Sequence, residues 1–432
     1  MSHKSLMVHG AWLVAVVLAF VLGGLRHDSG KNGAGTDGSA SSSAPTKSAR
    51  AAAGLGDSDR SAGDAMALRR SDRDGFQGGD SSRGKRSWEQ LARLSARDPD
   101  PITRRLAFTR LLESMTPENV LAIREELVAA GVEGEQWRDF AYRWGALGGR
   151  EAVEMAATTP ERDMNAALTG WAAADPAAAM NLLANLPENM QGSRESLTAS
   201  VVEGISHQDT ALATDFVLRM TAEGTGNGER LIDVVARQAL REGGHEDAAR
   251  WSETLPDGPV KAAAMDRVAG TYVRKDPEAA AEWAQGFATN DYAARVIEEV
   301  GDGLARRDPV AAANWLENLP EGRGQIVGLR SVFGDWEDRD PVAAGEYLMN
   351  MPQSAQRDSA ISGFSQGYAW QDPRTAIAWA EDISDPGLRQ STLTNAGQAF
   401  FRRDPKAAKT WLANIDLPPE AKKAIQNPPR RR

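Results

Sequence analysis

The chain has 432 residues, of which 41% are hydrophobic, so it can bury an extended core and could hold more than one average domain. It contains no cysteine, which excludes disulfides, thiolate metal sites, thiol nucleophiles and a lipidated N-terminal cysteine. The formal charge of −10 is distributed unevenly, because residues 88–432 carry about −14. Such an acidic segment gives a nucleic-acid partner no electrostatic support.

An apolar segment lies at the N-terminus of the chain. Lys4 precedes a run from Leu6 to Leu25 that only His9 and Gly10 interrupt. The run predicts an N-terminal hydrophobic helix within residues 1–25, either an uncleaved signal anchor or a signal peptide. No small-x-small cleavage motif follows it, which favours the anchor. We therefore expect residues 6–25 to span the cell membrane once, with the rest of the chain on the extracytoplasmic side; a cleaved signal would leave a secreted or periplasmic protein.

Residues 26–87 are rich in Gly, Ser, Ala, Asp and Arg and contain few large apolar side chains. A segment of this composition cannot bury enough apolar surface to offset the entropy of folding, so it predicts a disordered tether. The stretch from Gly79 to Lys85 has the spacing of a phosphate-binding loop, but Arg86 stands where that motif needs Ser or Thr. We therefore expect no nucleotide and no other small-molecule cofactor.

Residues 88–147 predict a helical capping region. A first short helix contains Trp88, a second begins at Pro101, and a third ends before Gly131. These helices lack the regular spacing of the sequence that follows. Terminal segments of this kind cover the exposed end of a helical repeat array.

A repeat of 32 residues dominates the rest of the chain. Asp-Pro dipeptides recur at that spacing, and a large aromatic residue stands seven positions after each Asp. The five Asp residues and their aromatic partners are Asp276 with Trp283, Asp308 with Trp315, Asp340 with Tyr347, Asp372 with Trp379, and Asp404 with Trp411. Looser copies begin at Asp175, Asp209 and Gly244, and a shorter one near Gly148 with Met155 in the aromatic position. Fixed self-similarity of this kind indicates a repeat architecture.

Each repeat predicts two helices. Asp is a preferred N-cap and Pro a preferred first helical residue, so the dipeptide begins a helix A whose apolar face includes the aromatic residue. A helix B follows, with apolar residues four, eight and eleven positions before the next Asp. The residue five positions before that Asp is usually small, as at Gly170, Gly303 and Gly367, which allows neighbouring helices to approach closely. The aromatic residues are interpreted as core, with carbohydrate stacking as the alternative.

These patterns predict an all-α chain with helical repeats over residues 148–417 and a C-terminal stub with a basic tail over residues 418–432. The Asp-Pro-x-Ala-Ala-x-x-Trp pattern, seen at residues 308–315, resembles the bacterial-type α-solenoid proteins of tetratricopeptide-like or HEAT-like architecture. Its period of 32 and its signature differ from the tetratricopeptide consensus, so the similarity is one of architecture and no site residue carries over. The resemblance implies a right-handed α-solenoid of antiparallel helix pairs that binds a protein or peptide.

The sequence predicts no catalytic, cofactor-binding or metal-binding residue. His207 and His245 have no carboxylates at ligand spacing, and no serine has a companion histidine in a recognisable motif. The residues predicted to bind a partner are polar and face away from the apolar side of helix B: Glu298, Glu299, Asp302, Arg330 and Gln366. The first three predict an acidic groove for a basic partner or a cation, and a solvated helix face is the alternative.

Taken with the resemblance, these features predict a non-enzymatic scaffold, tethered to the membrane or exported, whose partner is a protein or peptide of the cell envelope. The alternative is an envelope polysaccharide-binding protein or hydrolase built on an all-α array. Short, regular loops between the helices argue against a hydrolase, because the catalytic carboxylates of such enzymes need loops long enough to form a pocket.

Overall fold

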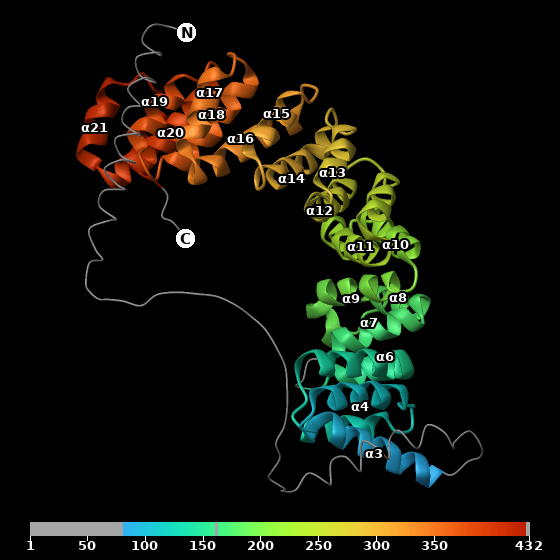
Figure 1. The fold of residues 1–432 in the computed structure, drawn as a ribbon. Helices are drawn as coiled ribbons and strands as arrows, with labels where there is room; N and C mark the ends of the chain where they lie inside the picture. The colour runs from blue at the N-terminus through green and yellow to red at the C-terminus, as the bar shows by residue number, and fades with distance from the viewer. Residues whose placement is uncertain (1–80, 160–162, 429–432) are drawn as a thin grey trace, which may run out of the picture. The chain divides into compact units, whose positions relative to one another are not determined.

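A computed structural model describes residues 81–159 and 163–428 of the protein. The described residues form twenty α-helices and two short 3₁₀ helices and contain no β-strand, which confirms the all-α class (Figure 1). The apolar run at residues 6–25 and the predicted tether up to residue 80 lie outside the described residues. Among the helices of the described part, none is long and apolar enough to cross a membrane.

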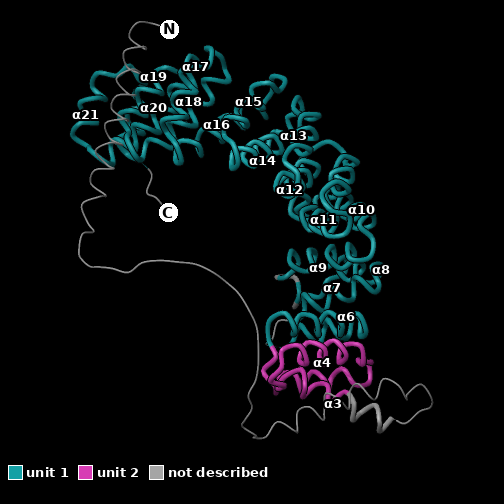
Figure 2. Tube along the Cα trace, in the orientation of Figure 1, with its two compact units in different colours: residues 1–24, 133–432 teal, residues 25–132 magenta. Residues whose placement is uncertain are grey.

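The chain divides into two compact units, and the boundary lies between Val132 and Glu133 (Figure 2). The described part of the N-terminal unit contains three helices: α3 (Ser81–Arg97), α4 (Pro101–Glu113) and α5 (Val120–Ala129). Helix α3 begins at Ser81, inside the range assigned to the tether, and it packs against α4 and α5. Leu111, Ile123 and Leu127 are fully buried in this unit.

The C-terminal unit contains the repeats. Its helices are α6 (Gly134–Ala156), α7 (Met164–Ala174), α8 (Pro176–Ala184), α9 (Arg194–Ser206), α10 (Thr210–Ala222), α11 (Gly228–Glu253), α12 (Pro259–Lys275), α13 (Pro277–Gln285), α14 (Ala294–Ala305), α15 (Pro309–Glu317), α16 (Arg323–Arg339), α17 (Pro341–Asn350), α18 (Ala355–Tyr368), α19 (Pro373–Glu381), α20 (Pro386–Arg403), α21 (Pro405–Asn414) and α22 (Pro419–Gln426). The 3₁₀ helices are η1 (Glu188–Ser193) and η2 (Asp291–Ala293).

The predicted Asp cap begins every helix A except the segments that follow Gly149 and Gly244. The side chains of Asp276, Asp340 and Asp404 each accept a hydrogen bond from a backbone amide in the first helical turn, and proline follows each of them. Gly149 and Gly244 replace this cap in two repeats, where the chain turns through φ values of 56° and 72°. The left-handed region is open to glycine without strain. As a result, α6 and α11 each contain two helical segments joined at a kink.

Packing within the C-terminal unit follows the chain. The A helices are the segment of α6 after Gly149, α8, α10, the segment of α11 after Gly244, α13, α15, α17, α19 and α21. The B helices are the segment of α6 before Gly149, α7, α9, the segment of α11 before Gly244, α12, α14, α16, α18 and α20. Each B helix packs against the B helix of the next repeat. From α13 to α19, each A helix packs against the B helices before and after it. This arrangement is compatible with a helical repeat fold (Figure 1).

Small residues allow the B helices to approach closely. A Cβ atom at Gly170 would overlap the carbonyl oxygen of Tyr142 on the preceding B helix, and one at Gly363 would overlap that of Arg330. A Cβ atom at Gly303 would overlap the side chain of Val273. The prediction that small residues serve helix contact is therefore confirmed.

The aromatic residues of the A helices are part of the core, as predicted. Trp379 is 1% exposed, and Trp283 is half-buried against the same apolar cluster. The indole of Trp283 also donates a 2.8 Å hydrogen bond from Nε1 to Oε1 of Glu253, on the preceding helix A. Met155, predicted to occupy the aromatic position of the first repeat, is 42% exposed, and that prediction is wrong. Gly149 takes the place of the capping Asp, so the position seven residues later is Ala156, which is 1% exposed.

Candidate functional site

Helix α14 presents one narrow polar stripe to solvent. The stripe contains Arg295, Glu298, Glu299 and Asp302 and continues to Arg306, the C-cap residue of the helix. Val296, Ile297 and Val300 between them are buried, since α14 packs against α12, α13, α15 and α16. The three carboxylates of this stripe are half-buried, so they are partly removed from water while still accessible.

Asp302 is the most perturbed of these groups. Burial raises its pKa to about 6, and the nearby carboxylates of Asp335, Glu298 and Glu299 add to the effect. The hydroxyl of Ser331 on α16 opposes it by donating a 3.1 Å hydrogen bond to Oδ2. Oδ1 is buried and accepts no hydrogen bond from the described residues. A cationic group placed here would stabilise the charged form of this carboxylate.

Glu298 lies among charges from three B helices. Burial raises its pKa, and Arg330 of α16 and Arg295 of α14 oppose that rise, whereas Asp266 of α12 adds to it. Burial also raises the pKa of Asp266. The structure therefore brings Glu298 and Arg330 together and adds Asp266 from the preceding repeat. We call the outward surface of α9, α11, α12, α14 and α16 the B-helix face.

The two remaining predicted residues make contacts of their own. Glu299 forms an ion pair with Arg306 at 3.6 Å. Gln366 is exposed on α18, and its Nε2 donates a 3.0 Å hydrogen bond to Oγ of Ser362. The Ser362 hydroxyl is also hydrogen-bonded to Thr392 of α20 at 2.9 Å. Gln366 therefore belongs to a neutral polar group on α18 and α20 and makes no direct hydrogen bond to the acidic residues.

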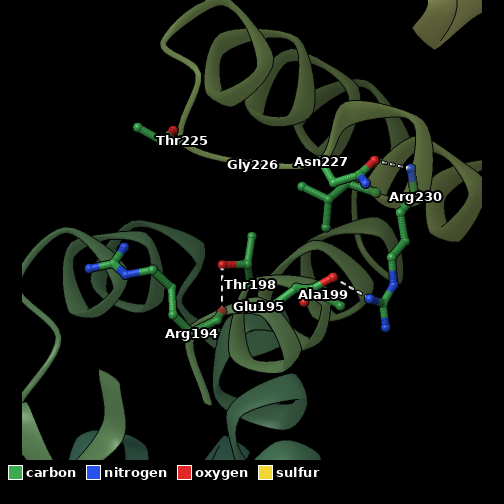
Figure 3. Close-up of a pocket in the computed structure, with 9 residues that line it drawn as sticks. Arg194, Glu195, Thr198, Ala199, Thr225, Gly226, Asn227 and Arg230 are labelled. Atoms are coloured by element: carbon green, nitrogen blue, oxygen red, sulfur yellow. Dashed lines mark hydrogen bonds and ion pairs between the residues drawn. The ribbon is translucent and has the colours of Figure 1, made fainter. Parts of the chain in front are cut away.

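Two cavities adjoin the B-helix face. One of about 650 Å³ is lined by residues of α11, α12 and α14, including Asp233, Asp266 and Arg295. The other, of about 280 Å³, lies between α9 and the loop that connects α10 to α11 (Figure 3). The two cavities share Asn227 and Arg230 in their walls. The two cavities therefore adjoin each other at the start of α11.

A recurring polar position was missed by the sequence analysis. It lies fifteen residues before the next capping Asp, and its side chains bind carbonyl groups at the end of the preceding helix A. Gln325 donates from Nε2 to the carbonyl oxygens of Leu316 and Leu319, each at 3.0 Å. Arg357 donates from Nε to that of Leu348 at 3.0 Å. The last carbonyls of a helix lack intrahelical partners, so these side chains satisfy them. The signal was present as a polar residue at a period of 32.

Glu337 was also missed. Its side chain is fully buried on α16, Oε2 accepts a 3.4 Å hydrogen bond from Gln371, and Oε1 has no hydrogen-bond partner among the described residues. Burial, together with the adjacent Asp338 and Asp335, raises its pKa to about 8. Nothing in the pattern of polar residues separates Glu337 from a surface glutamate, because its burial depends on the packing of α18.

The two histidines of the repeats pack against aromatic rings. His207 lies 5.9 Å from the ring of Tyr142, and His245 lies 4.8 Å from that of Tyr272. Burial lowers the pKa of His207. Within residues 81–159 and 163–428, no group of three or more His, Asp or Glu side chains could hold a metal ion.

The groups gathered on the B-helix face can attract a partner by charge and receive it in adjoining cavities. The half-buried carboxylates on α12 and α14 lie near the arginines Arg295 and Arg330. No protein-family model, curated protein or solved structure matches this chain.

Proposed function

We propose that this protein is an α-solenoid scaffold that binds a basic protein or peptide segment of the cell envelope along its B-helix face. In this proposal, right-handed antiparallel helix pairs present the face, residues 6–25 span the membrane or direct export, and the chain performs no catalysis. The packing of successive B helices supports the proposal, because it produces a long surface made of equivalent positions.

The main support is a set of three half-buried carboxylates on α12 and α14: Asp266, Glu298 and Asp302. Burial raises the pKa of each of them. Among the described residues, none of the three forms an ion pair within 4 Å. A lysine or arginine from a partner would offset the free-energy cost of keeping these carboxylates charged while half-buried, and it would form charge-assisted hydrogen bonds with them. The charge of about −14 over residues 88–432 would also accelerate association with a basic partner.

Polysaccharide binding is the second candidate. Its support is a cavity of about 600 Å³ between α19 and α21, lined in part by Trp411, Phe400, Glu381 and Asn414. Aromatic and polar side chains together suit a sugar. However, Trp411 packs against α20, where a Cβ atom at Gly397 would lie only 2.9 Å from its ring. The part of the ring that contacts α20 is therefore not available for stacking.

Affinity capture from a native envelope extract tests the proposal. The bait is the full chain, compared with a variant that carries Glu298→Lys, Glu299→Lys and Asp302→Lys. The control carries Glu278→Lys, Glu282→Lys and Glu346→Lys, which change the net charge equally on exposed positions of α13 and α17.

We expect one protein that is retained by the unaltered chain and the control but lost with the first variant. That protein should contain a lysine- or arginine-rich segment. A synthetic peptide of this segment should bind the unaltered chain and the control but not the first variant. A protein retained equally by all three baits would refute the proposal that the B-helix face is the binding site. Retention of glycan instead, in a manner that depends on Trp411, would support the second candidate.

A further inference from the structure

A small cavity opens where the B helices α9 and α11 diverge. Figure 3 shows α9, with Glu195, Thr198 and Ala199, on one side and the loop Thr225–Asn227 on the other. Arg230 of α11 reaches across to Glu195 and forms an ion pair that closes one end. The cavity is open to solvent on one side and has a volume of about 280 Å³.

The loop wall of this cavity is fixed by backbone hydrogen bonds. Gly224 has a φ of 66°, its amide donates to the carbonyl of Thr221 at 3.1 Å, and the amide of Thr225 donates to that of Met220 at 3.0 Å. This pair of bonds is the Schellman motif that ends a helix. Two residues later, Asn227 caps α11 by accepting a 3.0 Å hydrogen bond from the amide of Arg230. The cavity is therefore formed before any ligand arrives.

The interior is suited to an apolar group. Leu231 is 4% exposed and approaches Gly226 so closely that a Cβ atom there would lie 3.1 Å from its Cδ1. The hydroxyl of Thr198 is already bonded to the carbonyl of Arg194 at 2.8 Å. The charges of Arg230 and Glu195 neutralise each other. Since a cavity of about 150 Å³ can hold a benzene ring, this one has room for a leucine, methionine or phenylalanine side chain.

The cavity shares Asn227 and Arg230 with the larger cavity that Asp266 lines on the B-helix face. We infer that it anchors one large apolar side chain of the same basic segment that Asp266 and Glu298 attract. This inference rests on the proposed function and adds the chemistry of the partner: an extended peptide with one apolar anchor and basic residues at a set distance.

The distance between anchor and basic residue follows from helix packing. Packed helices lie about 8–10 Å apart, so two steps from α11 to α14 span roughly 16–20 Å. An extended peptide covers about 3.3 Å per residue, so roughly five or six residues separate the anchor from the basic side chain that faces Glu298. A basic residue about three positions from the anchor would reach Asp266 on α12.

Fluorescence anisotropy with defined peptides tests this inference on the full chain. The probes are fluorescein-labelled 14-residue peptides of Gly, Ser and Asn that carry one leucine, one arginine three positions from it and a second arginine four to nine positions from it. A matched series has serine in place of leucine. We expect leucine to tighten binding at least about tenfold at the best spacing, and the second arginine to stand five or six positions from leucine at that spacing.

Ala199→Trp fills the cavity and should remove the gain from leucine while leaving the serine peptides bound as before. Ala378→Trp, in the separate cavity between α19 and α21, serves as the control and should change neither series. Ala199→Glu gives a second test should the tryptophan variant fail to fold. Equal binding of leucine and serine peptides, or a leucine gain that persists in both Ala199 variants, would overturn the inference and leave the proposed function standing. Failure of all the arginine peptides to bind the unaltered chain would instead overturn the proposed function itself.

Discussion

Replacement of Arg357 by alanine should destabilise the repeats more than any other single loss of a helix-end contact. Arg357 is 1% exposed on α18, its Nη2 forms a 2.7 Å ion pair with Oδ2 of Asp382, and its Nε binds the carbonyl of Leu348. Loss of one member of a buried ion pair typically costs about 3–5 kcal/mol, because the other charge stays in the protein interior. The lost bond to Leu348 adds about 1 kcal/mol.

The matched control is Arg389→Ala. Arg389 occupies the equivalent position one repeat later and binds the carbonyl of Ile383 at 2.8 Å, but it is only half-buried and forms no ion pair among the described residues. Its loss should cost about 1 kcal/mol. The double variant Arg357→Leu with Asp382→Leu should be more stable than Arg357→Ala, because no charge is then buried alone.

Urea unfolding followed by circular dichroism at 222 nm measures these differences, and hydrogen exchange in α17, α18 and α19 shows whether they are local. We expect Arg357→Ala to unfold at a clearly lower urea concentration than Arg389→Ala. Equal midpoints for the two variants would refute the reasoning. So would a double variant that is less stable than Arg357→Ala.

Other residues give sharper tests of single contacts. Glu337 has a pKa raised to about 8 from an ordinary 4.5, so between these pH values the folded chain keeps a proton that the unfolded chain has lost. The free energy of unfolding should therefore fall as the pH rises from about 4.5 to 8, by at most about 5 kcal/mol. Glu337→Gln should remove this fall, measured as urea midpoints at pH 5 and pH 8.5. Gly363→Ala should lower the melting temperature, because its Cβ would overlap the carbonyl of Arg330, whereas Gly334→Ala, with 3.6 Å of clearance, should leave it unchanged or raise it. Asp340→Ala should cost about 1 kcal/mol through loss of the cap on α17 in thermal unfolding, and an unchanged value would contradict the capping account.

The elements that depend on local chemistry could be predicted from the sequence. An Asp followed by Pro specifies a helix start within three residues, so the A helices begin where that dipeptide stands. The aromatic position failed only at Met155, where Gly149 replaces the cap and the helical register changes. The capping Asp thus predicts the start and register of a helix A wherever that Asp is present.

The candidate site depended on distances between helices and was harder to predict. Glu298, Asp302 and Arg330 could be placed on one face, because helical spacing determines which side of a helix a residue occupies. The burial of Glu337, in contrast, depends on the approach of Gly367 on α18. The cavity beside Ala199 depends on where α11 begins relative to α9. The glycines of the loop between α10 and α11 do not indicate its volume.

Because each B helix packs against the B helices of adjacent repeats, a repeat can be added or removed without changes to the sequences of the others. Deletion of residues 308–339 would join the end of α14 to the Asp-Pro that begins α17, and the new junction would again be a capped helix start. The lengths of such proteins can therefore vary in steps of 32 residues through duplication or loss of DNA segments. Each step would lengthen or shorten the B-helix face by one helix and, under the proposed function, alter the length of partner that it can accommodate.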